Sequence, residues 1–311
     1  MCYPTWLSFS VVDKIYVYGH SRKRTVHVWK LYATVYPSQL RDICPYRCIR
    51  IEGPLMPMRE YLDSMKSDTL SWGVALTLFT SFASMPELVD IASVKNLVTL
   101  ELNASSELET LFNDKTTMPM AALNDRVVRT WGELAESGTA FAHLQVLRLS
   151  YQEHVSKATL QYLKSFPSLR LLAVYNCPSL SPLFENENQA IEGWQPVADP
   201  THLEAAYTSD EIYGYYNFIK ESDEKGSSMD RNTPILGFQI GREIRRPSKS
   251  RNIPDTVYLK RQSRHQERED ASEPPAKRPR PASGPRAARR GTMKARQAKD
   301  LDGVLGDLIG L

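Results

Sequence analysis

The chain has 311 residues, a hydrophobic fraction of 41% and a mean hydropathy of −0.40, which predicts a folded body joined to a polar segment. It contains no run of about 18 apolar residues, and its N-terminus lacks the pattern of a secretory signal, so we expect no membrane association. Its four cysteines are scattered, and Cys44 and Cys48 have no second Cys or His pair at zinc-site spacing. We therefore expect buried thiols in a reducing compartment, no metal and no cofactor.

Charge is unevenly distributed along the chain. Residues 242–299 hold 18 Lys and Arg against 6 Asp and Glu, whereas residues 300–311 hold three Asp and no basic residue. The remaining body, residues 1–241, is mildly acidic. The body and the basic tail therefore need separate explanations.

Residues 1–45 are predicted to form an N-terminal cap or an F-box-like segment. Their first part follows the apolar spacing of an F-box opening helix, but the characteristic Leu-Pro pair and acidic residue are missing. The residues with that spacing are Pro4, Leu7, Val11 and Ile15. A second apolar stripe, at Val28, Leu31, Val35 and Leu40, predicts a helix that Pro37 interrupts.

Pairs of apolar residues separated by one residue recur from residue 49 onward. They are Ile49/Ile51, Leu76/Leu78, Leu100/Leu102, Leu147/Leu149 and Leu172/Val174. Successive pairs begin 27, 24, 47 and 25 residues apart. Three of these intervals match the roughly 20–29-residue period of leucine-rich repeats. Residues 46–195 are therefore predicted to form a parallel sheet backed by helices.

The interval of 47 residues predicts an insertion rather than a hidden repeat. Residues 103–124 contain no apolar pair of this kind, whereas residues 124–138 have an N-cap candidate, Asn124, an apolar stripe and a terminal glycine. Residues 85–97 and 156–169 predict two connecting helices. Pro86 stands near the start of the first, and Leu160, Leu163 and Phe166 share one face of the second.

Residues 196–240 are predicted to form a C-terminal cap. Tyrosine and phenylalanine gather in residues 201–222, which favours a cover for the last repeat over a ligand cage. Residues 232–241 and 255–261 are either terminal strands or short motifs in a disordered region. Residues 241–299 are otherwise poor in large apolar side chains, which predicts a largely disordered tail.

Two repeats carry a resemblance to a known class. HLQVLRLS (residues 143–150) and SLRLLAVYNC (residues 168–177) resemble leucine-rich-repeat proteins, especially divergent F-box-like and uncharacterised proteins of filamentous fungi. The resemblance covers roughly residues 45–180. It implies an α/β fold, an irregular leucine-rich-repeat solenoid with a parallel sheet backed by helices, and a protein-binding role. It implies no catalytic residues.

A solenoid of this kind binds partners along its concave sheet. The side chains between and beside the apolar pairs are expected to face outward there, at Arg50, Thr77, Glu101, Arg148, Leu171 and Tyr175. Exposed Leu171 and Tyr175 would suit a protein partner, unless the C-terminal cap folds over them. Glu101 and Arg148 would pair if their strands are neighbours.

The basic tail predicts nuclear import. Basic residues bounded by proline suit the acidic grooves of an import receptor, at Lys277, Arg278, Arg280, Arg286, Arg289 and Arg290. Nonspecific nucleic-acid binding through phosphate contacts is a secondary reading, and a merely solvated tail is a third.

The last twelve residues predict a short amphipathic helix. Its apolar side chains are Leu301, Val304, Leu305, Leu308 and Ile309. Three glycines weaken such a helix, so it should fold on a partner's groove or on the protein's own body. Its leucine spacing also fits a nuclear-export pattern.

The sequence shows no catalytic constellation, because the six histidines are dispersed and no phosphate-binding loop or nucleophile elbow is present. We therefore expect a non-enzymatic protein-interaction scaffold, in the nucleus, the cytoplasm or shuttling between them. An F-box-like substrate receptor that binds a ubiquitin-ligase adaptor is one alternative. A nucleic-acid binder that acts through its tail is another.

Overall fold

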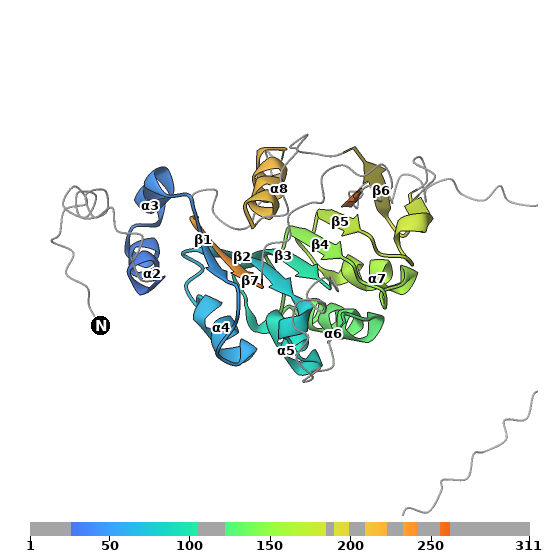
Figure 1. Cartoon of the computed structure of the whole chain (residues 1–311). Coiled ribbons are helices and arrows are strands. Elements are labelled where there is room, and N and C mark those ends of the chain that lie inside the picture. Colours follow the sequence, from blue (N-terminus) through green and yellow to red (C-terminus); the bar gives the residue numbers. More distant parts are fainter. Residues whose placement is uncertain are drawn as a thin grey trace, which may run out of the picture. The chain divides into compact units, whose positions relative to one another are not determined.

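The computed structural model describes residues 26–104, 122–184, 190–198, 209–222, 233–241 and 256–261 (Figure 1). The chain divides into two compact units, residues 1–268 and 269–311, and all described residues lie in the first. The strands are β1 (Tyr46–Ile51), β2 (Gly73–Phe79), β3 (Leu97–Asn103), β4 (Val146–Ser150), β5 (Leu171–Tyr175), β6 (Trp194–Val197), β7 (Ile235–Ile240) and β8 (Val257–Arg261). The α-helices are α2 (Val26–Val35), α3 (Pro37–Ile43), α4 (Met58–Met65), α5 (Met85–Asp90), α6 (Asp125–Glu136), α7 (Lys157–Tyr162) and α8 (Ser209–Ser222).

The eight strands form one mostly parallel sheet in the order β1-β7-β2-β3-β4-β5-β8-β6. From β2 to β5 the strands are parallel and follow the chain. Leu76, Leu100, Leu147 and Leu172 lie opposite one another in this register. The apolar pairs therefore predicted these four strands and their alignment correctly. Because β3 pairs directly with β4, the long interval between them holds an insertion, as expected.

The expected solenoid order fails at both ends of this run. β1 does not pair with β2, because β7 lies between them and is parallel to both. At the other end, β8 pairs antiparallel to β5 and carries the edge strand β6. Residues 232–241 and 255–261 thus contain sheet strands, and β8 falls inside the range that we predicted as tail.

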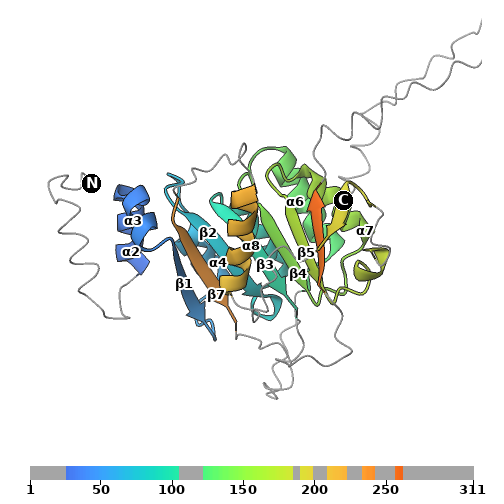
Figure 2. The same ribbon diagram turned by 90° about the horizontal axis from the view of Figure 1, so that it is seen from above.

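Helices cover both faces of the sheet (Figures 1 and 2). α4, α5, α6 and α7 lie on one side of the sheet, below it in Figure 1, with the main apolar core between them and the strands, and α8 lies on the other side. The caps follow the sequence signals. Asn124 caps α6 by accepting from the backbone N–H of Val127, and Ser84 and Glu87 form a capping box at α5.

Side chains also tie consecutive strands together at their ends. The Gln152 amide donates to the Leu102 carbonyl of the preceding strand at 3.2 Å, and accepts from the Leu123 N–H at 3.3 Å. One repeat later, the Cys177 thiol lies 3.6 Å from the Leu149 carbonyl. Burial raises the pKa of Cys177 to about 11, so its thiol stays a protonated donor. Cys177 is buried, whereas Cys44 and Cys48, which we expected to be buried, are half-buried.

Two glycines of β7 and its end lie against aromatic side chains of the neighbouring strands. A Cβ at Gly237 would lie 2.9 Å from the Tyr46 ring, so this ring could not lie where it does. Gly241, directly after β7, has φ of +112°, and a Cβ there would lie 2.8 Å from the Cβ of Phe79. That backbone conformation and that contact both exclude larger residues.

We expect Gly241→Ala to lower the free energy of unfolding by about 2–4 kcal/mol, from left-handed backbone strain and overpacking against Phe79. Urea denaturation followed by circular dichroism measures this difference. Gly53→Ala is the matched control, because no atom lies within 4 Å of the added Cβ. Equal effects of the two substitutions would contradict the role of Gly241.

Candidate protein-interaction surfaces

The predicted row of partner-binding residues lies across one face of the sheet. The register places Arg50 opposite Gln239, Gln239 opposite Thr77, Thr77 opposite Glu101, and Glu101 opposite Arg148. Gln239 belongs to the inserted strand, so reasoning from the repeats alone missed it. The expected pairing is confirmed, since Arg148 Nε lies 3.5 Å from Glu101 Oε1.

Solvent exposure of this row, however, was predicted wrongly. Arg50 is exposed, whereas the other five side chains are at most 5% exposed: Thr77, Glu101, Arg148, Leu171 and Tyr175. α8 packs over this face against β7, β2, β3 and β4 (Figure 2). The alternative that a C-terminal element folds over Leu171 and Tyr175 is confirmed for Leu171, which shares an apolar cluster with Ile212 and Tyr215 of α8. Tyr175 packs edge-to-face on Tyr151 at 5.2 Å instead.

The aromatic segment was predicted to cover the last repeat, but α8 lies elsewhere. It contacts the middle of the sheet, and β8 and β6 lie beyond β5. Its buried side chains are Ile212, Tyr215, Tyr216 and Ile219. The Tyr215 hydroxyl lies 2.8 Å from that of Tyr258 on β8, and Tyr213 stacks on Tyr46 of β1 at 4.2 Å. α8 thus connects strands from the two ends of the sheet.

The centre of the covered face is polar. Glu101 accepts from the Thr77 hydroxyl at 3.2 Å and pairs with Arg148, and all three side chains are buried. Buried charges of opposite sign stabilise each other, which offsets the cost of removing them from water. Tyr216 of α8 is uncharged, because burial, and to a smaller extent the neighbouring Tyr213, raises the pKa of Tyr216 to about 12.

A second surface lies on α2 and is open. The sequence stripe Val28, Leu31 and Val35 predicted a helix here, and α2 is that helix. The structure buries Trp29 and Ala33 and leaves that stripe exposed at 36–37% for each residue. Trp29 packs edge-to-face on Trp72 at 6.0 Å, and the Lys30 amine donates to the Ser64 carbonyl of α4. α2 is therefore apolar on two sides.

Further exposed apolar side chains flank β1. Ile43, at the end of α3, is 38% exposed, and Leu55 and Met56, which follow β1, are 96% and 46% exposed. The Tyr61 hydroxyl accepts from the Leu55 and Met56 N–H groups at 3.1 and 3.4 Å. These hydrogen bonds hold the backbone while the side chains stay in solvent.

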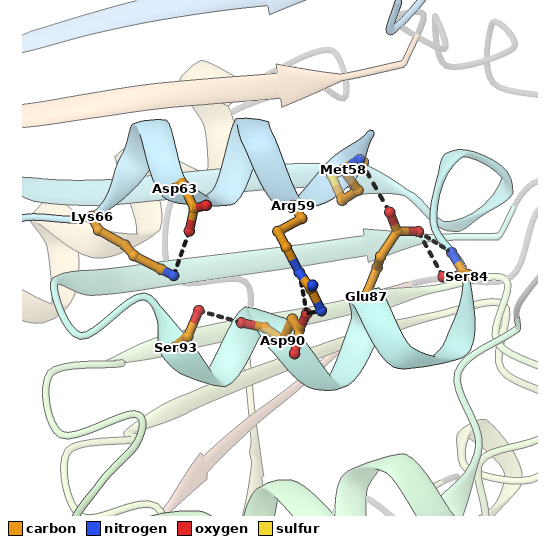
Figure 3. A network of polar contacts seen from close by, with 8 residues as sticks. All are labelled: Met58, Arg59, Asp63, Lys66, Ser84, Glu87, Asp90 and Ser93. Carbon is orange, nitrogen blue, oxygen red and sulfur yellow. Dashed lines mark hydrogen bonds and ion pairs between the residues drawn. The ribbon is translucent and has the colours of Figure 1, made fainter. Parts of the chain in front are cut away.

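Polar contacts join α4 to α5 (Figure 3). Arg59 of α4 pairs with Asp90 of α5 at 2.8 Å, and the Met58 N–H donates to Glu87 at 3.1 Å. Burial tends to raise the pKa of Glu87, but hydrogen bonds from Ser84 and Met58 hold it below its usual value. α4, on which α2 rests, is therefore firmly placed.

Both tail motifs lie outside the described residues. They are the predicted import residues at 277–290 and the predicted helix at 301–309, and both stay predictions. Within the described ranges, no group of three His, Cys, Asp or Glu side chains could hold a metal ion. None of the described helices is long and apolar enough to cross a membrane.

Comparisons with protein-family models, with curated proteins and with solved structures give no match.

We expect Arg148→Met to lower the free energy of unfolding by about 3–5 kcal/mol, because it leaves the Glu101 carboxylate buried without this ion pair. The double variant Arg148→Met/Glu101→Leu should be less destabilised than the sum of its single changes. Urea denaturation of all four proteins completes this cycle.

The control cycle uses Arg129 and Glu133, an exposed pair of the same chemistry on α6 at 2.9 Å. We expect a coupling of about 0.3–0.5 kcal/mol there. Equal coupling in the two cycles would show that burial adds nothing to the Glu101–Arg148 pair.

Proposed function

We propose that this chain is a non-enzymatic protein-interaction scaffold of an irregular leucine-rich-repeat type, which docks a partner on the exposed stripe of α2. The observation that carries this proposal is the two-sided apolar character of α2. A surface helix normally buries its one apolar stripe and presents polar residues outward. Val28, Leu31 and Val35 instead form a second stripe over two turns.

The repeat assignment has support from side chains as well as from strand order. Gln152 and Cys177 follow the last apolar residue of their pairs by three positions, and each reaches a carbonyl of the preceding strand. Such contacts satisfy backbone carbonyl groups at the place where the chain leaves a parallel strand and turns toward the next helix. β2 to β5 are the repeat portion, and β7 is an addition to it.

The spacing of the exposed stripe indicates how the partner binds. Residues at i, i+3 and i+7 are anchors that a helix inserts into an apolar groove. The partner should therefore offer a concave apolar surface. Ile43, the exposed last residue of the adjoining helix α3, can extend the contact.

We expect the triple variant Val28→Asp/Leu31→Asp/Val35→Asp to lose at least tenfold in affinity for partners recovered with the wild-type chain. The control Thr34→Asp/Ser38→Asp/Gln39→Asp adds the same charge at exposed polar positions on α2 and the adjoining α3, and it should keep the wild-type affinity for these partners. Affinity purification with quantitative mass spectrometry, then titration of the purified partner, measures this. Equal loss in both variants, or in neither, would remove α2 as the docking surface.

The F-box-like receptor is a second candidate, favoured by one observation. Two helices with exposed apolar residues precede the first strand, where an adaptor-binding module would stand. Titrating the full chain with purified ligase adaptor tests this reading. Binding that the α2 triple variant abolishes would support it, and no binding by the wild-type chain would exclude it.

Nuclear entry remains a proposal that rests on the tail sequence. Replacing Lys277, Arg278, Arg280, Arg286, Arg289 and Arg290 by Ala should abolish nuclear accumulation of the tagged full chain, as seen by fluorescence microscopy. A control that replaces Arg264 and Arg268 should leave it unchanged. Unchanged localisation of the first variant would contradict import.

The same variant tests nucleic-acid binding, since phosphate contacts release counterions and make affinity fall with salt. Salt-independent binding, or equal binding by variant and wild type, would exclude that role. The C-terminal motif at residues 301–309 is proposed as a second partner site.

A further inference from the structure

We infer that the sheet face beneath α8 is a groove for an amphipathic helix, which α8 fills and which a partner helix with the same apolar pattern can take in its place. The inference concerns a different face from the α2 surface. It rests on the anchors of α8, on the polar floor beneath it and on incomplete packing at one end.

α8 contacts the sheet as a bound peptide helix does. Its four buried side chains, Ile212, Tyr215, Tyr216 and Ile219, stand at i, i+3, i+4 and i+7. This is the anchor pattern of helices that lie in grooves. Two of the anchors are tyrosines, a residue type that is enriched in interfaces because it combines apolar area with a polar tip.

α8 is also isolated from the main core. The other buried helices pack on the opposite side of the sheet, where they share one continuous apolar cluster with the strands. The cluster under α8 is separate and much smaller, and includes Ala75, Val98, Val146 and Leu171. Removing α8 would therefore leave the main core intact.

The sheet face beneath α8 carries polar side chains as well as apolar ones. Three further polar side chains share this face: Gln239 opposite Thr77, Thr99 two residues before Glu101, and Ser150 two residues after Arg148. All three are buried, and their side-chain oxygens form no hydrogen bond to the described protein groups. These oxygens are available as acceptors to a helix that lies over them.

α8 does not fill the groove completely. A pocket of about 330 Å³ remains beside its second half, between the helix and the start of β7. Tyr213, Tyr216 and Lys220 line it from the helix, and Arg41, Thr233 and Ile235 line it from the other side. The Tyr216 hydroxyl is buried and has no hydrogen-bond partner in the described part of the chain.

Hydrogen exchange on the full wild-type chain gives the first test. If α8 can leave by itself, its amides should exchange at least tenfold faster than those of β3 and β4. Exchange of α8 and these strands at one common rate would overturn the inference, because α8 would then leave only when the whole protein unfolds.

The second test uses a fluorescent peptide of residues 209–222 as the probe. The variant Tyr215→Ala/Ile219→Ala weakens α8 in its own groove, so it should bind the peptide at least tenfold more tightly than the wild type does, by fluorescence anisotropy. The control Phe218→Ala removes a side chain that is 39% exposed on the same helix and should behave as the wild type. A peptide with Ile212→Asp should not bind.

A folded variant that binds no peptide would overturn the inference. If the variant does not fold, hydrogen exchange is measured on the wild-type chain with saturating peptide. The peptide should then accelerate amide exchange in α8 of the wild type and leave exchange in β3 and β4 unchanged. Unchanged exchange in α8 would be evidence against a replaceable helix.

Discussion

The insertion of β7 is the constraint on which the rest of the structure depends. All six of its residues are buried, and it pairs along its whole length with β1 on one side and β2 on the other. β1 has no pairing with β2, so its place in the sheet is set by β7, a strand from much later in the chain. α2, which precedes β1, packs in addition on Trp72 and on α4. The absence of a Cβ at Gly237 and Gly241 leaves room for the rings of Tyr46 and Phe79 beside β7.

Local patterns predicted the repeat strands but not this insertion. β2 to β5 follow a period that the sequence displays, and neighbours in sequence are neighbours in the sheet, so the register could be written down in advance. β7 reads ILGFQI and is buried on both faces, which leaves no alternation to assign a face. No local signal tells where such a strand pairs, because its partners lie at large sequence separation. The strand itself was predictable, and its place was not.

The helix α2 was predictable, but the side that it buries was not. Val28, Leu31 and Val35 share a helical stripe, but Val26, Trp29 and Ala33 share another with the same spacing. Periodicity cannot choose between two such stripes. Side-chain size can, because Trp29 buries more apolar area than any residue of the competing stripe and finds Trp72 as its partner. A sequence with two apolar faces on one helix is itself a signal of an interface, and this signal was available from the start.

The polar row under α8 has a structural role that is separate from any binding role. A slip of one residue in β3 or β4 would turn Glu101 or Arg148 into the main apolar core, so the pair fixes the register of both strands. That role requires Glu101, Arg148 and the hydroxyl of Thr77. It does not require the oxygens of Gln239, Thr99 and Ser150, which form no hydrogen bond to the described groups around them. The need to fix the register therefore does not by itself account for polar residues at these three positions.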